Sequence, residues 1–351
     1  MNILWFNLKI DENNQALSFA LDWINTMSLK VDKIFVITME KQKYNLNNNV
    51  IVFSLGKELG YSRLRRFFVF YKLLFRILRK EKIDVAFSHM NPLFVVMAGF
   101  FLKIKKIPIY LWYCHKSVTN ILRLSVFLSE KIFTCSEISM NVKTRKKEVI
   151  GHGINLERFN QLDCIRKDNL LLYVGRISPV KNVHILIDVI DLLVNNGYDS
   201  IALLIVGEPT QMQRDIDYKN EMIVKINDKR LNNNIRFVGK KNYCSMTKTY
   251  NEAQILLSLS DTGSVDKVLL EAMVCGCIPV SSNDSFKLLF ENKFPELITS
   301  KDAYDVFDKV KNLLLMDKEN IIKLQSVLKK EVEDKYSLEY LMKYLYNRFK
   351  K

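Results

Sequence analysis

Glycine and proline are scarce in this chain, with 11 and 6 residues among 351. No Ser/Pro-rich or low-complexity tract interrupts the sequence, so no segment has the composition of a disordered linker. The hydrophobic share of 48% is sufficient for buried cores, and the charged share of 26% is ordinary for a globular protein. Since one domain takes about 150 residues, this length predicts two ordered domains.

Long apolar runs are also missing. The longest, Leu93–Leu102, has about half of the roughly 20 residues that a membrane-spanning helix requires. The first residues, MNILWFNLKID, lack the basic start, the apolar stretch and the cleavage site of a secretory signal. We therefore expect a cytoplasmic protein with no transmembrane helix.

Clusters of metal-binding residues are not found either. The six cysteines are scattered, and only Cys275 and Cys277 lie close, at a spacing that zinc and redox motifs do not use. Asp215 and Asp217 form a D-x-D pattern, but carboxylates two residues apart on a helix diverge, which favours a solvated face over a divalent-ion site. We predict no required metal and no other cofactor.

Acidic residues are outnumbered, 38 against 53 Lys and Arg, which gives a formal net charge of +15. The excess is concentrated between Ser62 and Lys82, where eight cations accompany the single acid Glu81 and alternate with apolar residues. This segment suits a solvated helix face or contact with anionic lipid headgroups. Nucleic acid is not expected, because no helix-turn-helix, zinc-finger or RNP-like signature is present. The predicted membrane face consists of Arg63, Arg66, Lys72, Arg76, Arg79 and Lys80.

Short β-branched runs alternate with segments of helical periodicity in both halves, which predicts two parallel sheets wrapped by helices. We expect strands near residues 3–6, 33–37, 50–53, 85–88, 107–112 and 131–135, and then near 170–174, 202–206, 235–238, 255–258 and 278–280. Helices are expected from about 15, 62, 92, 118, 182, 213, 243 and 265, and throughout 301–351. The predicted domains are 1–160 and 161–335, followed by a C-terminal helix, 336–351, for which packing back on the first domain is an option.

Two cations follow the expected strand at 170–174. In VGRISPVKN, Arg176 and Lys181 bracket a proline-containing turn directly before a helix. Cations beside a helix amino terminus make a site for an anion such as diphosphate, and a solvated loop is the alternative.

A second polar loop, Ser260–Ser264, follows the strand at 255–258 and leads into a helix that carries Glu271. Amides at a helix start can hold phosphate or sugar hydroxyls, and a carboxylate can accept two hydrogen bonds from a ribose diol. A surface helix residue is the alternative for Glu271. His115, just after the strand at 107–112, is either a ligand-facing or a structural histidine.

Together, VGRISPVKN and LLEAMVCGCIPVSS resemble the motifs of glycosyltransferase family 4, the retaining enzymes of GT-B fold. The resemblance is specific over 170–282, and in the first half it rests on topology, WYCHKSV and GHGINLERF. It implies two Rossmann-like domains that face a central cleft. It also implies transfer of a hexose-type sugar from a UDP- or GDP-linked donor to a saccharide acceptor, lipid-linked in bacterial surface polysaccharide synthesis, at the inner face of the cell membrane.

The resemblance also assigns roles to residues. Arg176 and Lys181 would contact the donor diphosphate, Glu271 the donor ribose, and the backbone of Gly239 and Lys240 the nucleobase. His115 would act at the donor sugar as the catalytic residue. The donor sugar region would comprise Gly263, Ser264, Asp266 and Lys267, the last two through their backbone amides.

One position departs from the family pattern. Many members carry a glutamate eight residues before Glu271, where this chain has Gly263. This glycine keeps open a non-catalytic scaffold that binds nucleotide or a partner transferase. A sugar-nucleotide epimerase on the same fold is a second open alternative.

Overall fold

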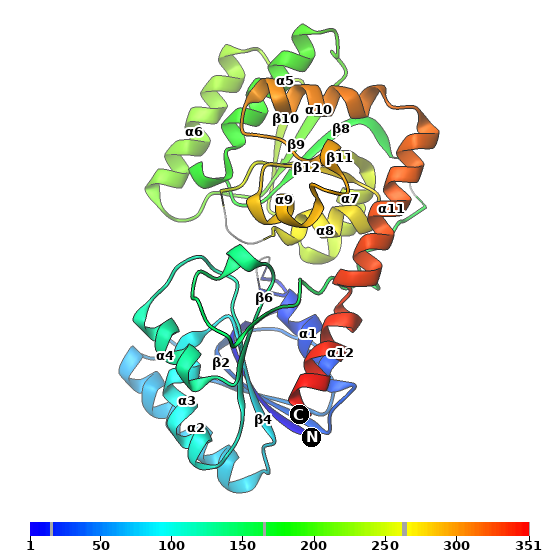
Figure 1. Cartoon of the computed structure of the whole chain (residues 1–351). Helices are drawn as coiled ribbons and strands as arrows, with labels where there is room; N and C mark the ends of the chain where they lie inside the picture. Colours follow the sequence, from blue (N-terminus) through cyan, green and yellow to red (C-terminus); the bar gives the residue numbers. More distant parts are fainter. Residues whose placement is uncertain (15–16, 164–165, 262–264, 351) are drawn as a thin grey trace. The chain divides into compact units, whose positions relative to one another are not determined.

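The computed structural model describes residues 1–14, 17–163, 166–261 and 265–350 (Figure 1). The chain forms two compact units, one made of Met1–Gly153 with the residues from Leu338 onward, the other of Ile154–Ser337. Each unit contains one sheet and its own hydrophobic core.

The sheet of the first unit is parallel throughout its described strands, in the order β3-β2-β1-β4-β5-β6-β7. Its strands are β1 Asn2–Ile10, β2 Lys33–Lys41, β3 Val50–Ser54, β4 Val85–His89, β5 Ile109–Trp112, β6 Lys131–Thr134 and β7 Lys147–Val149. The helices are α1 Phe19–Ser28, α2 Arg63–Lys80, α3 Pro92–Ile104, α4 Asn120–Leu128 and α12 Leu338–Phe349.

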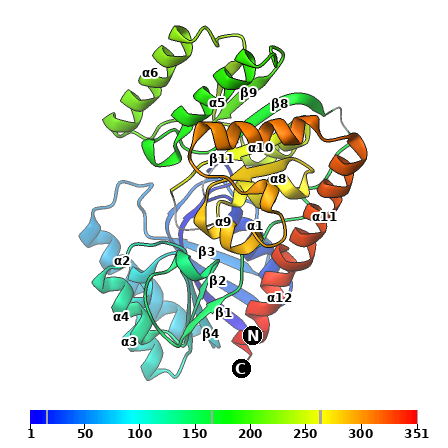
Figure 2. The ribbon, with the colours of Figure 1, turned by 45° about the horizontal axis from the view of Figure 1, so that its top comes forward.

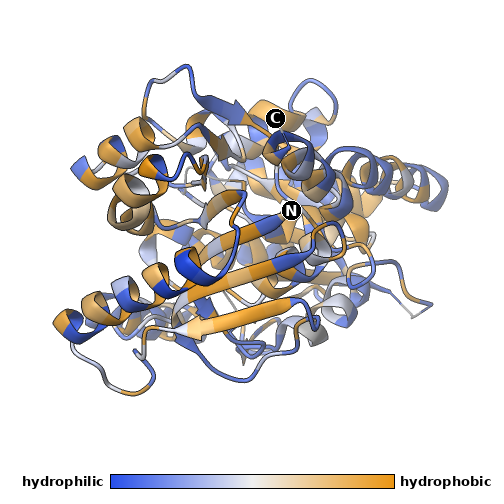
Figure 3. Ribbon diagram, turned by 90° about the horizontal axis from the view of Figure 1, so that it is seen from below, coloured by the Kyte–Doolittle hydropathy of each residue, from blue (hydrophilic) through white to orange (hydrophobic). Residues whose placement is uncertain are grey.

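Helices cover both faces of this sheet, with α2, α3 and α4 on one face and α1 and α12 on the other (Figures 1 and 2). Alternate residues of β1 serve the two faces: Leu4 and Phe6 pack with α2 and α3, whereas Ile3 and Trp5 pack with α1 and α12. Because both faces are buried there, the inner strands β1, β2, β4 and β5 are rich in buried apolar residues, and Figure 3 shows orange strands among helices with one polar side.

The second unit has a parallel sheet in the order β10-β9-β8-β11-β12. Its strands are β8 Lys167–Val174, β9 Ala202–Val206, β10 Ile235–Gly239, β11 Ala253–Ser258 and β12 Ile278–Ser281. Helix α5 packs with α6 and α10, and α8 packs with α7 and α11. The helices are α5 Val183–Asn195, α6 Gln213–Asp228, α7 Met246–Glu252, α8 Lys267–Val274, α9 Asp284–Phe290, α10 Ala303–Leu315 and α11 Lys318–Tyr336.

The two units meet in the chain at Gly153–Ile154, a few residues before the expected boundary at 160. The difference arises because Ile154 and Phe159 are buried in the core of the second unit. The last helix, α12, contributes Leu338 and Leu341 to the core of the first unit.

The predicted parallel sheets are confirmed, but among the described residues the strand β7 and the helix α9 were not predicted. Strand β7 has only three residues, with no apolar run, and α9 is too short to show a helical period. The helix expected from 15 begins at Phe19, and the one expected from 243 opens with the 3₁₀ turn Tyr243–Ser245 before α7. Across the described ranges, no helix combines the length and the apolar character needed to cross a bilayer.

Candidate active site

In the second sheet, β9 and β10 lie on one side of β8, and β11 and β12 lie on the other, so the strand order reverses at β8. Since parallel strands end at one edge, this is where ligands bind in open α/β sheets. Arg176 and Lys181 follow β8, Gly239 ends β10, and Asp266 follows β11. The structure thus brings these predicted donor-site residues to one edge of one sheet.

The loop that carries Arg176 is anchored by a close approach of two backbones. Gly207, after β9, has φ of 142°, and a Cβ there would lie 1.8 Å from the carbonyl oxygen of Gly175. Only glycine allows this contact. The Ile177 amide donates to the Glu208 carbonyl at 3.1 Å, which continues the strand pairing past the end of the sheet and sets the start of the loop.

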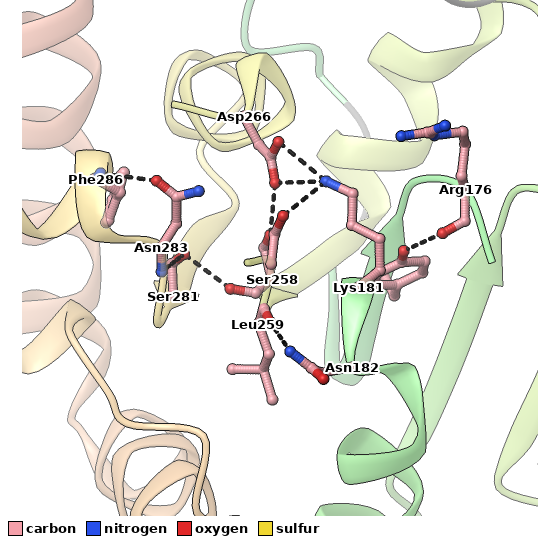
Figure 4. Close-up of polar contacts among 11 residues, drawn as sticks. Arg176, Lys181, Asn182, Ser258, Leu259, Asp266, Ser281, Asn283 and Phe286 are labelled. Carbon is pink, nitrogen blue, oxygen red and sulfur yellow. Dashed lines mark hydrogen bonds and ion pairs between the residues drawn. The ribbon is translucent and has the colours of Figure 1, made fainter. Parts of the chain in front are cut away.

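The Lys181 ammonium contacts two neighbouring side chains at this edge. Its Nζ donates to Oδ1 and Oδ2 of Asp266 at 3.1 and 3.0 Å and to Oγ of Ser260 at 2.9 Å (Figure 4). Ser258 Oγ donates to Asp266 Oδ2 at 3.2 Å. The Lys181 and Asp266 side chains are only 11% and 15% exposed. The sequence interpretation used Asp266 for its backbone amide alone and did not anticipate this ion pair.

Arg176 differs from Lys181. Arg176 is exposed, and within the described part of the chain its guanidinium makes no hydrogen bond or ion pair. The backbone beneath it is held, because the Tyr173 hydroxyl donates to the Arg176 carbonyl at 2.7 Å. Arg176 is therefore a cation available to an incoming anion.

Asn182 joins the loops after β8 and β11. Its φ is 51°, a left-handed conformation that asparagine tolerates better than most residues. Its Nδ2 donates to the Leu259 carbonyl at 2.8 Å and to Asp261 Oδ2 at 3.1 Å. The two loops that carry Lys181 and Ser260 thus hold a fixed relation to one another.

Glu271 lies inside the unit and is only 5% exposed, so the alternative of a surface helix residue is wrong. Its Oε2 accepts a hydrogen bond of 2.8 Å from the hydroxyl of Tyr250, which is fully buried. Burial, with the adjacent Glu271 charge, raises the pKa of Tyr250 well above its ordinary value, so this hydroxyl remains a donor. Sequence reasoning missed Tyr250, because nothing in its spacing links it to Glu271.

The other residues of this unit that the sequence assigned to the donor site differ in their exposure and backbone conformation. Gly239 has φ of 70°, and its carbonyl accepts from the Gly207 amide at 2.9 Å. Lys240 is exposed, and Lys267 is the half-buried first residue of α8. Gly263 and Ser264 lie outside the described residues.

His115 belongs to the first unit, in the loop after β5. It lines a shallow pocket of about 390 Å³ together with Asn91, Tyr113 and Thr119. Its Nδ1 accepts from the Ser117 amide at 3.0 Å, so the proton of the neutral ring resides on Nε2. The imidazole is exposed and can present Nε2–H to a ligand of this pocket.

The D-x-D aspartates do not converge. Asp215 is buried rather than solvated, with its Oδ2 accepting from the Thr210 hydroxyl, whereas Asp217 accepts from Gln213 at the helix surface. Among the residues that the structure describes, no group of three or more His, Cys, Asp or Glu side chains could hold a metal ion.

The predicted membrane face lies on α2, and its cations are exposed except for Arg66, which is half-buried. Apolar side chains are exposed beside them, with 67% of Leu64, 44% of Phe67 and 63% of Phe68 accessible. The helix thus shows cations and bare aromatic rings on the same surface.

Comparison with known proteins gives one consistent result. The family model of glycosyl transferases group 1 matches residues 156–331, half of the chain. The capsular polysaccharide biosynthesis glycosyltransferase CapH of Staphylococcus aureus is 25% identical over 257 residues, which cover 66% of this chain and 68% of CapH.

Solved structures match over the whole length. Anabaena Alr3699/HepE in complex with UDP and glucose has a TM-score of 0.74 at 14% identity, over 99% of both chains. A glycosyltransferase from Rickettsia africae ESF-5 has a TM-score of 0.77 at 12% identity, over 100% of this chain and 98% of that one. These likenesses confirm the predicted fold class, two Rossmann-like units of GT-B type.

Proposed function

This chain belongs to the glycosyl transferases group 1 family and is a glycosyltransferase, and from that premise we propose that it transfers a hexose from a UDP- or GDP-linked donor to a saccharide acceptor. The proposed process is synthesis of a bacterial surface polysaccharide, which the similarity to CapH supports. We also propose assignment to family 4, with retention of anomeric configuration, on the motifs around Arg176 and Glu271.

The observation that carries the proposal is the convergence at the carboxyl edge of the second sheet. Arg176, exposed and without a partner among the described residues, lies on the same loop after β8 as Lys181. A buried carboxylate, Glu271 on α8 of the same unit, is held by Tyr250. Arg176 and Lys181 would neutralise the charge that grows on the departing diphosphate, and Glu271 would hold the ribose. One preorganised donor of this kind is worth about 3 kcal/mol to the transition state.

A lipid-linked acceptor at the inner face of the cell membrane is the second part of the proposal. Helices α2, α3 and α4 contain nine Lys and Arg and no Asp or Glu. Exposed apolar side chains accompany these cations, among them Phe68, Phe100 and Phe127 at 63%, 66% and 67% accessibility. A surface that joins uncompensated positive charge to bare aromatic rings suits an anionic bilayer.

Sugar-nucleotide turnover tests the proposal. The purified protein is screened for thermal stabilisation by UDP, GDP and their hexose conjugates, where a ligand at a hundred times its Kd adds about 2.7 kcal/mol. Conjugates that stabilise the protein are then incubated with lipid-linked saccharides, and the products are analysed. Transfer to the acceptor supports the proposal. An isomerised sugar nucleotide would instead indicate an epimerase, and binding without turnover a scaffold.

A further inference from the structure

The Lys181 ammonium is fully occupied within the protein. An ammonium has three N–H groups, and those of Lys181 meet the two oxygens of Asp266 and the hydroxyl of Ser260. Its positive charge is also balanced by the carboxylate. A diphosphate that reaches this edge therefore meets a lysine already bound to an internal anion, whereas the exposed Arg176 guanidinium has no partner among the residues that the structure describes.

We propose that Asp266 is an internal counter-ion that competes with the donor diphosphate for Lys181. When the donor binds, Lys181 exchanges the carboxylate for phosphate oxygens, and when the nucleoside diphosphate leaves, the carboxylate takes the lysine back. This role rests on the proposed function, since it requires a diphosphate at Arg176 and Lys181. It makes Asp266 a positioning residue that weakens product binding and speeds product release.

The surroundings of the pair are suited to such an exchange. Carboxylate and phosphate oxygens are both acceptors for an ammonium, so one can replace the other. The pair retains 11% and 15% of its side-chain surface, so that a ligand can reach it, and a lysine side chain has freely rotating bonds. Asp266 keeps a partner when the lysine leaves, because Ser258 donates to its Oδ2.

A pair with a purely structural role makes the opposite prediction. If Asp266 only held Lys181 in place, its removal would disorder the lysine and weaken anion binding. If it competes, its neutralisation removes a negative charge from the site and frees the ammonium, so anion binding tightens. The sign of the change in affinity distinguishes the two roles.

The experiment measures the Kd of UDP and of GDP by titration calorimetry for the parent and for Asp266→Asn, which keeps the shape and removes the charge. We expect about tenfold tighter binding of the nucleotide that the parent prefers, or about 1.4 kcal/mol. The donor KM falls in parallel while kcat does not rise, since product release slows. Asp266→Glu restores the carboxylate and should return both constants toward the parent values.

Two controls isolate the pair. Asp261→Asn removes another carboxylate of the same loop, one that binds Lys301 and Asn182 rather than Lys181, and should leave the Kd within about twofold. In a Lys181→Met background, Asp266→Asn should lose most of its effect, because the competition no longer exists. If Asp266→Asn does not fold, Asp266→Ser provides the same neutralisation.

The outcomes separate this inference from the function on which it rests. A parent protein that binds neither UDP nor GDP would overturn both. A parent that binds one of them, with unchanged or weaker binding in Asp266→Asn, would overturn the counter-ion role and leave the proposed function in place.

Discussion

The hydroxyl of Tyr250 donates to Oε2 of Glu271 at 2.8 Å, in the interior of the second unit. Tyr250 lies on α7 and Glu271 on α8, so this hydrogen bond joins two helices as well as two side chains. A donor on one oxygen fixes the orientation of the carboxylate. Tyr250 is therefore a positioning residue for the proposed ribose contact.

We expect Glu271→Gln to weaken binding of the nucleoside diphosphate, because the amide presents an N–H where the ribose diol meets an acceptor. Hydrogen bonds to charged groups contribute about 1.5–3 kcal/mol, which corresponds to a rise of tenfold or more in Kd. Tyr250→Phe should have a smaller effect, because it keeps the Glu271 charge and removes only the hydrogen bond that orients the carboxylate. Titration calorimetry measures both, and an unaltered Kd in Glu271→Gln would remove this residue from the ribose site.

Arg176→Ala should raise the donor KM with no loss of thermal stability, because the guanidinium is exposed and has no partner among the described residues. The expected cost is again about 1.5–3 kcal/mol, and Arg176→Lys should recover part of it. Steady-state kinetics and a melting curve test the two halves of the prediction. A melting temperature that falls while KM stays constant would make Arg176 a structural residue.

His115→Ala should lower kcat, on the order of 10²-fold, while UDP affinity stays near that of the parent. The reason is that His115 lies in the first unit and the proposed diphosphate and ribose contacts in the second. Tyr113→Phe, which loses only the hydrogen bond to the Ser117 carbonyl in the same pocket, is the matched control. Full activity in His115→Ala would end its assignment as catalytic.

The enzyme should co-sediment with anionic vesicles, because each Lys or Arg near the membrane surface contributes about 1 kcal/mol to binding. Binding should weaken at high salt, because dissolved ions screen charges that are more than about 8 Å apart at physiological ionic strength. Replacing Arg76, Arg79 and Lys80 by Glu should abolish the binding. The same reversal of three exposed lysines of α11 (Lys318, Lys323 and Lys330) changes the net charge equally and should preserve it. Equal binding by both triple variants, or binding to neutral vesicles, would argue against a docking face on α2.

Exhaustive chelation should leave sugar transfer intact, because charge neutralisation at the diphosphate is assigned to Arg176, Lys181 and helix amides. Activity is measured with and without EDTA, and with added Mg²⁺ or Mn²⁺. Loss with EDTA that either ion restores would show that a metal completes the site.

Sequence reasoning succeeded where a property is local. Strands such as Ala202–Val206 were predicted because parallel strands buried on both faces are continuous apolar runs. The carboxyl ends of these strands then indicate where ligand-binding residues lie. It failed where side chains from distant segments meet. Lys181 and Asp266 are 85 residues apart in the chain, and their pairing depends on loop shapes that no spacing encodes. The three residues of β7 carry no pattern at all.

Because α12 returns to the first unit, the second unit is an insertion within it, and its two ends are neighbours. The Ile154 amide donates to the Tyr336 carbonyl at 2.7 Å, and Ile154 forms a bridge with Ser337. On the first unit's side of these two chain crossings, a Cβ on Gly153 would lie 2.7 Å from the Leu341 side chain of α12, so the chain is closely packed there too. Residues 154–337 therefore form a cassette with paired ends. The corresponding unit of a relative, the proposed donor-binding part, could replace it through these two neighbouring chain crossings, and the first unit of this chain, the proposed acceptor-binding part, would stay whole.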